Sequence, residues 1–395
     1  MIRWTLLCLF ALTTLPALAR GVSPKAGIWR FELRYPQTRV PFLLELEPQK
    51  RGWAVTLING QERIPLEVRA TKDSWIVPLQ TYQNHLELRI NSKTRITGHF
   101  VKAAKAPAEK IPLEGVHGAI RRIDHGAKPT VELSGQWAIE MTAPDGKKTA
   151  GLALFDQRGA TLNASIATPT GDYRYIDGVV TGDSFTTAAF DGVFNFVFRG
   201  KLEGGVLRGE IAGKSITTFT GKRDAAAKLP DPFQQTQASA LSFSFADTAG
   251  RVVALADYKG KPVILQIFGS WCPNCIDELN FLAPWYLANR AKGIEVVALS
   301  FERAPSPDEA RRHLAMVVKK RAIPYPVLLA GTSSEETPEL KLPGVRNFLS
   351  FPTLIFLNRR HEVVKVHAGF NGPGTGLHHQ AFQQAFSAAV AEALK

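Results

Sequence analysis

Residues 268–279 read FGSWCPNCIDEL and contain two cysteines separated by two residues, where an apolar run gives way to a helical pattern. The run before them, residues 263–268, is short, β-branched and almost entirely apolar, which is typical of a strand buried on both faces of a parallel sheet. Pro273 suits the first turn of a helix, because its missing N–H would have no partner there. The free N–H groups and dipole of such a helix end favour the thiolate of Cys272, the form that attacks a disulfide. The stretch therefore predicts a dithiol that exchanges electrons.

The first 19 residues have the three parts of a secretory signal peptide: a basic start, an apolar run over 4–18 and the small-residue site Ala17-Leu18-Ala19. An uncleaved membrane anchor is the alternative, but the run is shorter than the roughly 20 residues that a spanning helix needs. We therefore expect a periplasmic protein. Loss of Cys8 with the signal peptide leaves Cys272 and Cys275 as the remaining cysteines, too few for a disulfide scaffold or a four-ligand zinc site.

The chain has 395 residues, which predicts two or three domains. It is basic, with 48 Lys and Arg against 35 Asp and Glu and a formal net charge of +13. Such a charge attracts anionic membrane surfaces or acidic proteins, and outside the cytoplasm we expect no nucleic-acid partner. A generally basic composition is equally consistent with the charge, so it indicates no particular function.

Residues 27–221 alternate apolar and polar side chains with regular turn signals, which predicts an all-β region. Hairpins are expected at 86–100 and 194–211. The two halves of this region resemble each other at an offset of about 108 residues, since Gly27-Ile28-Trp29 matches Gly135-Gln136-Trp137. The repeat predicts two β-modules of seven or eight strands, residues 20–104 and 105–222, which close separately as barrels or sandwiches or share a core.

Residues 223–240 are polar, small and interrupted by proline, which is typical of an interdomain linker. Beyond the linker, strand and helix patterns alternate, and this predicts an α/β domain over residues 241–395. Strands are expected at 241–245, 263–268, 294–300, 326–329, 353–357 and 363–367, and helices at 274–291, 307–321 and 377–394. The predicted fold class is therefore an all-β N-terminal half followed by an α/β domain.

A CxxC at a strand-to-helix junction in such a domain resembles the thioredoxin fold. The chain is most similar to the TlpA/ResA-like thiol–disulfide oxidoreductases of the bacterial cell envelope, over residues 241–395. The similarity is carried by Trp271-Cys272-Pro273-Asn274-Cys275, by Glu278, by FPTLIFL at residues 351–357, and by a helical insertion around residues 304–321. The β-rich half has at most a loose similarity to modules found ahead of such domains.

The resemblance implies that Cys272 is the exposed nucleophile and Cys275 the resolving thiol, which together form the redox disulfide. Pro352 would be a cis-proline that presents the backbone of Phe351 to an extended peptide. Glu278 would be a partly buried acid that sets the proton balance, and the alternative is an exposed glutamate in the first helical turn.

Gln266 stands where thioredoxin has a buried aspartate, so this position cannot titrate. Proton transfer to Cys275 must then use Glu278, water or a backbone group. The catalytic residues of the prediction are Cys272, Cys275, Glu278 and Pro352, and the active-site surround is Trp271, Pro273, Asn274, Gln266 and Phe351.

We expect the protein to reduce disulfides of envelope proteins, with electrons from a membrane donor and without a metal or cofactor. No cation lies between the two cysteines, which favours a reducing rather than a strongly oxidising couple. A peroxiredoxin-like peroxidase is less favoured, because Gly269 and Ser270 replace the required proline and threonine. Two further functions fit the sequence: copper delivery, and ligand or partner capture by the β-half of an envelope binding protein.

Overall fold

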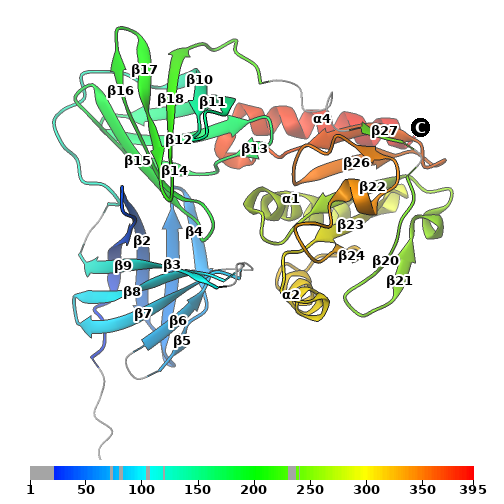
Figure 1. Ribbon diagram of the computed structural model, residues 1–395, viewed down its shortest axis with the longest axis horizontal. Helices are drawn as coiled ribbons and strands as arrows, with labels where there is room; N and C mark the ends of the chain where they lie inside the picture. Colours follow the sequence, from blue (N-terminus) through cyan, green and yellow to red (C-terminus); the bar gives the residue numbers. More distant parts are fainter. Residues whose placement is uncertain are drawn as a thin grey trace, which may run out of the picture.

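The computed structural model describes residues 22–71, 74–79, 83–103, 107–118, 121–229, 237–239 and 241–395. These residues form two large antiparallel β-sheets, one above the other in Figure 1, and a helix-covered C-terminal domain beside them. The predicted fold class, an all-β half followed by a thioredoxin-like α/β domain, is confirmed. The predicted signal peptide, with Cys8, lies outside the described residues. Within the described ranges, no helix is both long and apolar enough to cross a membrane.

The first sheet holds nine strands of the described chain in the order β4-β3-β2-β1-β9-β8-β7-β6-β5. Alternate side chains of each strand point into one core, as Trp29, Phe31 and Leu33 do from the first strand. The strands are β1 (Gly27–Arg34), β2 (Arg39–Pro48), β3 (Trp53–Asn59), β4 (Glu62–Leu66), β5 (Arg69–Ala70), β6 (Ser74–Pro78), β7 (His85–Ser92), β8 (Arg95–Lys102) and β9 (Glu109–His117).

The second sheet also holds nine described strands, in the order β11-β10-β18-β17-β16-β15-β14-β12-β13. An additional pairing between β11 and β12 closes this sheet into a barrel, whereas no such closing pair joins β4 and β5 among the described residues. The strands are β10 (Gly135–Thr142), β11 (Lys148–Arg158), β12 (Thr161–Thr168), β13 (Gly171–Asp172), β14 (Ile176–Thr181), β15 (Ser184–Phe190), β16 (Asn195–Glu203), β17 (Val206–Ala212) and β18 (Ile216–Arg223).

The internal repeat has a structural counterpart at the first strand of each sheet. Gly27 and Gly135 have φ values of 111° and 109°, a backbone conformation that favours glycine. The indole N–H of Trp29 donates to the carbonyl of Lys25 (2.9 Å), and that of Trp137 donates to the carbonyl of Leu133 (2.8 Å). The same residue types therefore make the same local contact, which supports an internal duplication. Both predicted hairpins are present, as β7–β8 and β16–β17.

The boundary expected after residue 104 is wrong. Residues 109–117 form β9, which pairs with both β1 and β8, so the first sheet continues to His117. The Ala-, Lys- and Pro-rich run at 102–110 stands between the paired strands β8 and β9 of one sheet. Its composition did not reveal this, because a hairpin loop and a domain linker favour the same small and polar residues. The two sheets also share part of a core, since Ala188, Phe190 and Val197 of the second sheet pack with the first.

The C-terminal sheet has the order β24-β23-β22-β26-β27 and carries the dithiol. All six residues of β22 are buried, as expected, but β22 runs parallel to β23 and antiparallel to β26, so the sheet is mixed rather than parallel. Its strands are β22 (Val263–Phe268), β23 (Glu295–Phe301), β24 (Val327–Gly331), β26 (Thr353–Leu357) and β27 (Val363–Ala368), and the helices are α1 (Pro273–Asn289), α2 (Pro307–Lys320), α3 (Pro338–Lys341) and α4 (Leu377–Ala393).

Shorter elements complete this domain: β19 (Gln237–Ala238), β20 (Ser244–Ala246), β21 (Val252–Ala254), η2 (Leu255–Tyr258), η3 (Arg290–Lys292), β25 (Val345–Arg346) and η4 (Pro373–Thr375). One face of the sheet packs against α1, α2 and α4, and the other against the segment around Leu241 and Phe243. The end of the predicted linker is part of this domain, since β19 pairs with β25. The insertion expected between the central strands is α2.

Candidate active site

Cys272 is the N-cap residue of α1. Its backbone is extended, with φ −100° and ψ 118°, and its sulfur accepts a hydrogen bond from the backbone N–H of Cys275 (3.3 Å). Pro273 occupies the first helical turn, as the sequence predicts. Both cysteines are free thiols in this structure. The helix end therefore holds the Cys272 sulfur against an N–H group that stabilises a thiolate.

The loop before β26 forms the other side of the site. The Phe351–Pro352 peptide bond is cis, so the cis-proline implied by the resemblance is confirmed. The Cys272 thiol donates to the carbonyl oxygen of Phe351 at 3.7 Å. Trp271 packs edge-on against the Phe351 ring, with centroids 5.4 Å apart, and its indole N–H donates to the carbonyl of Phe301 (2.8 Å). These contacts hold Trp271 and Phe351 in place beside the Cys272 sulfur.

Glu278 lies fully buried beneath the dithiol, so the alternative of an exposed glutamate is wrong. Its carboxyl accepts a hydrogen bond from the side-chain amide of Gln266 (2.8 Å), while its other oxygen has no hydrogen-bond partner among the residues that the structure describes. Burial raises the pKa of Glu278 to about 8. Burial also raises the pKa of Cys275, and the adjacent Cys272 and Glu278 raise it further. The structure thus brings the Cys275 thiol and the buried Glu278 carboxyl together, both with raised pKa values.

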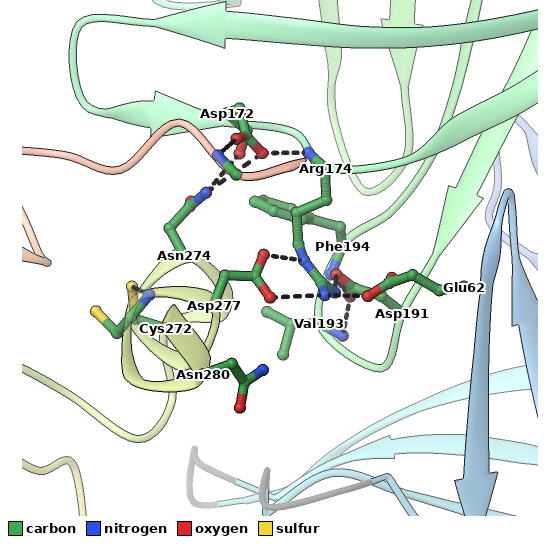
Figure 2. Close-up of polar contacts among 12 residues, drawn as sticks. Glu62, Asp172, Arg174, Asp191, Val193, Phe194, Cys272, Asn274, Asp277 and Asn280 are labelled. Carbon is green, nitrogen blue, oxygen red and sulfur yellow. Dashed lines mark hydrogen bonds and ion pairs between the residues drawn. The ribbon is translucent and has the colours of Figure 1, made fainter. Parts of the chain in front are cut away.

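Cys272 is only 6% exposed, so the expectation of an exposed nucleophile is wrong. The Phe351 carbonyl lies against its sulfur, and the β-half packs on the first turns of α1 just beyond it. The side-chain amide of Asn274 donates to the backbone carbonyl of Asp172 (3.1 Å) and to its carboxylate (3.4 Å) (Figure 2). Burial raises the pKa of Asp172 to about 7, with Asp277 adding to the effect.

Sequence reasoning missed the groups that reach the site from elsewhere in the chain. Asp172 and Arg174 come from the β-half and contact Asn274 and Asp277 of α1. Arg303 follows β23, and its guanidinium lies over the Trp271 ring, 3.4 Å from the centroid. Burial lowers the pKa of Arg303, and negative charge on the sulfurs of Cys272 and Cys275 opposes that effect. No spacing pattern marks these residues in the sequence.

Comparisons with known proteins agree with this geometry. Residues 226–383 match the Redoxin family. ResA of Bacillus subtilis, a thiol–disulfide oxidoreductase, is 28% identical over 130 residues, which are 33% of this chain and 65% of ResA. ResA of Halalkalibacterium halodurans is 25% identical over 130 residues, which are 33% of this chain and 66% of that protein. The chain thus spans slightly less than two thirds of these relatives.

Among solved structures, a thiol:disulfide interchange protein of the thioredoxin family from Chlorobium tepidum is 24% identical, with a TM-score of 0.30, over 40% of this chain and 97% of that one. The family match and the ResA relatives confirm the resemblance inferred from the sequence at the level of the domain. The C-terminal region of this chain is a redoxin domain related to the ResA thiol–disulfide oxidoreductases, and it follows a β-rich N-terminal region.

Proposed function

We propose that this protein is an exported oxidoreductase that reduces disulfides in other proteins of the cell envelope, with Cys272 as nucleophile and Cys275 as resolving thiol. The observation that carries the proposal is the position of the Cys272 sulfur. It lies between the backbone N–H of Cys275 at the helix start (3.3 Å) and the carbonyl oxygen that precedes the cis-proline (3.7 Å). The export step rests on the signal-peptide pattern of residues 1–19.

The proposed reaction passes two electrons to the substrate. The Cys272 thiolate attacks one sulfur of the substrate disulfide, forming a mixed disulfide, and the displaced sulfur leaves as a thiolate that takes up a proton. Cys275 then loses its proton and attacks the Cys272 sulfur. This step releases the second substrate thiol and forms the Cys272–Cys275 disulfide. A dithiol donor, which we place at the membrane, returns two electrons and two protons to complete the cycle.

Glu278 is the group that we propose to accept the proton of Cys275. It lies one helical turn after Cys275 on the same face of α1 and is fully buried. Its raised pKa of about 8 lies near the pH at which a general base works best, and the neighbouring Gln266 does not titrate. Water and backbone groups are the alternative proton acceptors.

Trapping of the intermediate tests this function. A Cys275→Ala variant keeps the nucleophile but cannot resolve the mixed disulfide, so it is expected to accumulate covalent adducts with substrate proteins. Cell-envelope extracts separated without reductant, and again after reduction, measure the adducts and release the partners for identification. The Cys272→Ser/Cys275→Ala double variant is the control and should form none. Absence of adducts with Cys275→Ala would count against protein disulfides as substrates.

A further inference from the structure

Arg174 connects the three parts of the protein at one guanidinium group (Figure 2). It follows β13 and is 5% exposed. Its Nε and Nη2 atoms donate to the carboxylate of Asp277 on α1, at 2.7 and 3.0 Å. Nη1 donates to Asp191, in the turn between β15 and β16 (2.7 Å), and Nη2 donates to Glu62 of β4 (2.7 Å). One side chain therefore links the first sheet, the second sheet and the helix that begins at the dithiol.

The backbone of Arg174 is held in a conformation that arginine rarely adopts. Its φ is +58°, in the left-handed region, and its N–H donates to the Asp172 carboxylate (2.6 Å). An unfavourable backbone conformation persists where the surrounding contacts maintain it. The contacts here are those of the guanidinium, which points toward α1.

The charges around Arg174 make docking of the two halves depend on it. Glu62 and Asp191 belong to the β-half and Asp277 to the redox domain, and all three surround one cation. Burial raises the pKa of Glu62, and the nearby Asp277 and Asp191 raise it further, so these carboxylates repel one another. Without the guanidinium, the carboxylates of Glu62 and Asp191 on the β-half face the carboxylate of Asp277 on the redox domain with no cation between them.

The docked β-half contacts both segments that flank the dithiol, the start of α1 and the strand paired with the cis-proline. A Cβ atom added to Gly171 would lie 3.1 Å from the Asn274 side chain, and one added to Gly369 would lie 2.9 Å from the carbonyl carbon of Thr170. Gly369 in turn donates its N–H to the carbonyl of Pro352 (2.8 Å). The backbone of residues 170–171 thus contacts the start of α1 and the residue paired with the cis-proline.

A second segment of the β-half reaches the same region. The Asp191 carboxylate accepts hydrogen bonds from the N–H groups of Val193 and Phe194 (2.9 and 2.8 Å), and Val193 packs against the core that contains Cys272. Between this turn and the neighbours of the nucleophile, Trp271 and Pro273, lies a cavity of about 470 Å³. A cavity of that size suits a small molecule or a chain segment, whereas a folded partner needs roughly 800 Å² of open surface.

We propose that Arg174 is a positioning residue that keeps the β-half docked over the dithiol and thereby selects the disulfides that reach Cys272. Disulfides in short peptides or extended chain segments pass beside Trp271 in the docked state. Disulfides on folded proteins require release of the β-half. This selectivity rests on the proposed function of Cys272, but the docking itself does not depend on turnover.

Thiol modification tests the docking without any enzymatic step. The reduced full-length protein is treated with iodoacetamide or with a maleimide attached to a protein-sized polymer, and mass spectrometry measures the rate at Cys272. Arg174→Ala is expected to raise the rate with the bulky reagent about tenfold or more, equivalent to 1.4 kcal/mol, and the rate with iodoacetamide less than about threefold. Arg174→Lys keeps the charge without the forked geometry and should give an intermediate rate.

Arg199→Ala is the matched control, because Arg199 lies on the same β-sheet and its guanidinium pairs with the half-buried Glu210, away from α1. It should leave both rates unchanged. If Arg174→Ala does not fold, Asp277→Ala removes the same link from the side of the redox domain. This variant should also raise the rate at which the polymer-linked maleimide modifies Cys272. The proposal would be overturned if the ratio of the maleimide-polymer rate to the iodoacetamide rate at Cys272 were the same in the wild type and in the folded variant.

Reduction kinetics separate this selectivity from the proposed function. With dithiothreitol as donor, Arg174→Ala is expected to reduce a disulfide on a folded protein faster relative to one in a short peptide. If the peptide disulfide is not reduced by wild type or variant although labelling responds as expected, the proposed function fails and the docking stands. If both disulfides are reduced with an unchanged ratio, the function stands and the selectivity fails.

Discussion

Replacement of Phe190 with alanine is expected to lower the free energy of unfolding of the β-half by about 3–5 kcal/mol. Phe190 ends β15 of the second sheet, but its fully buried ring packs in the core of the first. The ring centroid lies 4.2 Å from that of Phe42 and 5.3 Å from that of Phe100. Truncation of the Phe190 side chain leaves a cavity between the two sheets. The strands on both sides are rigid, so they cannot move to fill it. The loss of stability is therefore expected in both sheets.

Native-state hydrogen exchange measured by mass spectrometry checks this result, because it follows residues 27–117 and 135–223 separately. Phe190→Ala should reduce the protection of both ranges. Phe219→Ala is the control: its ring packs within the core of the second sheet, 5.0 Å from Phe198, and its loss should reduce protection in the second range alone. Unchanged protection of residues 27–117 in Phe190→Ala would mean that the sheets are independent.

The sequence predicted two related β-modules but left open whether they share a core. The reason is that the alternation of apolar and polar residues carries limited information. Alternate apolar residues indicate which face of a strand is buried, and this signal is the same whether the covering side chains come from the same sheet or from another. Along β15, Phe185 and Ala189 face the core of the second sheet, whereas Ala188 and Phe190 lie on the opposite face and pack in the core of the first. The aromatic neighbours of Phe190 are accordingly Phe42 and Phe100 of the first sheet.

In the C-terminal domain, the strands buried on both faces were predicted to the residue. Val263–Phe268 and Thr353–Leu357 are almost entirely apolar runs, and the structure has β22 and β26 at those bounds. The strand expected at 241–245 instead forms at Ser244–Ala246. Leu241 and Phe243 are buried but lie outside it, because an apolar pattern indicates burial and not backbone pairing.

The dithiol was predictable because its parts are adjacent in sequence, and the cis-proline followed from the resemblance. The groups that cover the dithiol were not predictable. Asp172 and Arg174 lie 102 and 103 residues before their partners on α1, and neither belongs to a motif with fixed spacing. Only the packing of the two halves brings them to Asn274 and Asp277, so the low exposure of Cys272 could not be inferred from the residues around it.

Replacement of Glu278 with glutamine is expected to remove a pH dependence of stability between about pH 4.5 and 8. Burial raises the pKa of Glu278 from 4.5 to about 8, so the folded protein holds a proton there at neutral pH that the unfolded chain releases. Because the pKa of Glu278 is higher in the folded than in the unfolded state, its contribution to the free energy of unfolding is complete below pH 4.5. This contribution is lost as the pH rises through 8. Glutamine is neutral throughout, so above pH 8 the variant should be more stable than the wild type by on the order of a few kcal/mol. Denaturant unfolding at several pH values measures this difference.

The same substitution is expected to slow resolution of the mixed disulfide by about 10²-fold at the upper end of that pH range. In the proposed reaction, Cys275 loses its proton before it attacks the Cys272 sulfur, and burial raises the pKa of its thiol. In this reaction Glu278, whose pKa is raised to about 8, accepts the proton once it is ionised, so the wild-type rate should rise with pH through that value. Rapid-quench measurement of thiol release from a preformed mixed disulfide gives the rate. Glu309→Gln makes the same change on the exposed first turn of α2 and should match the wild type. If Glu278→Gln keeps both the wild-type rate and its rise with pH, water or a backbone group carries the proton.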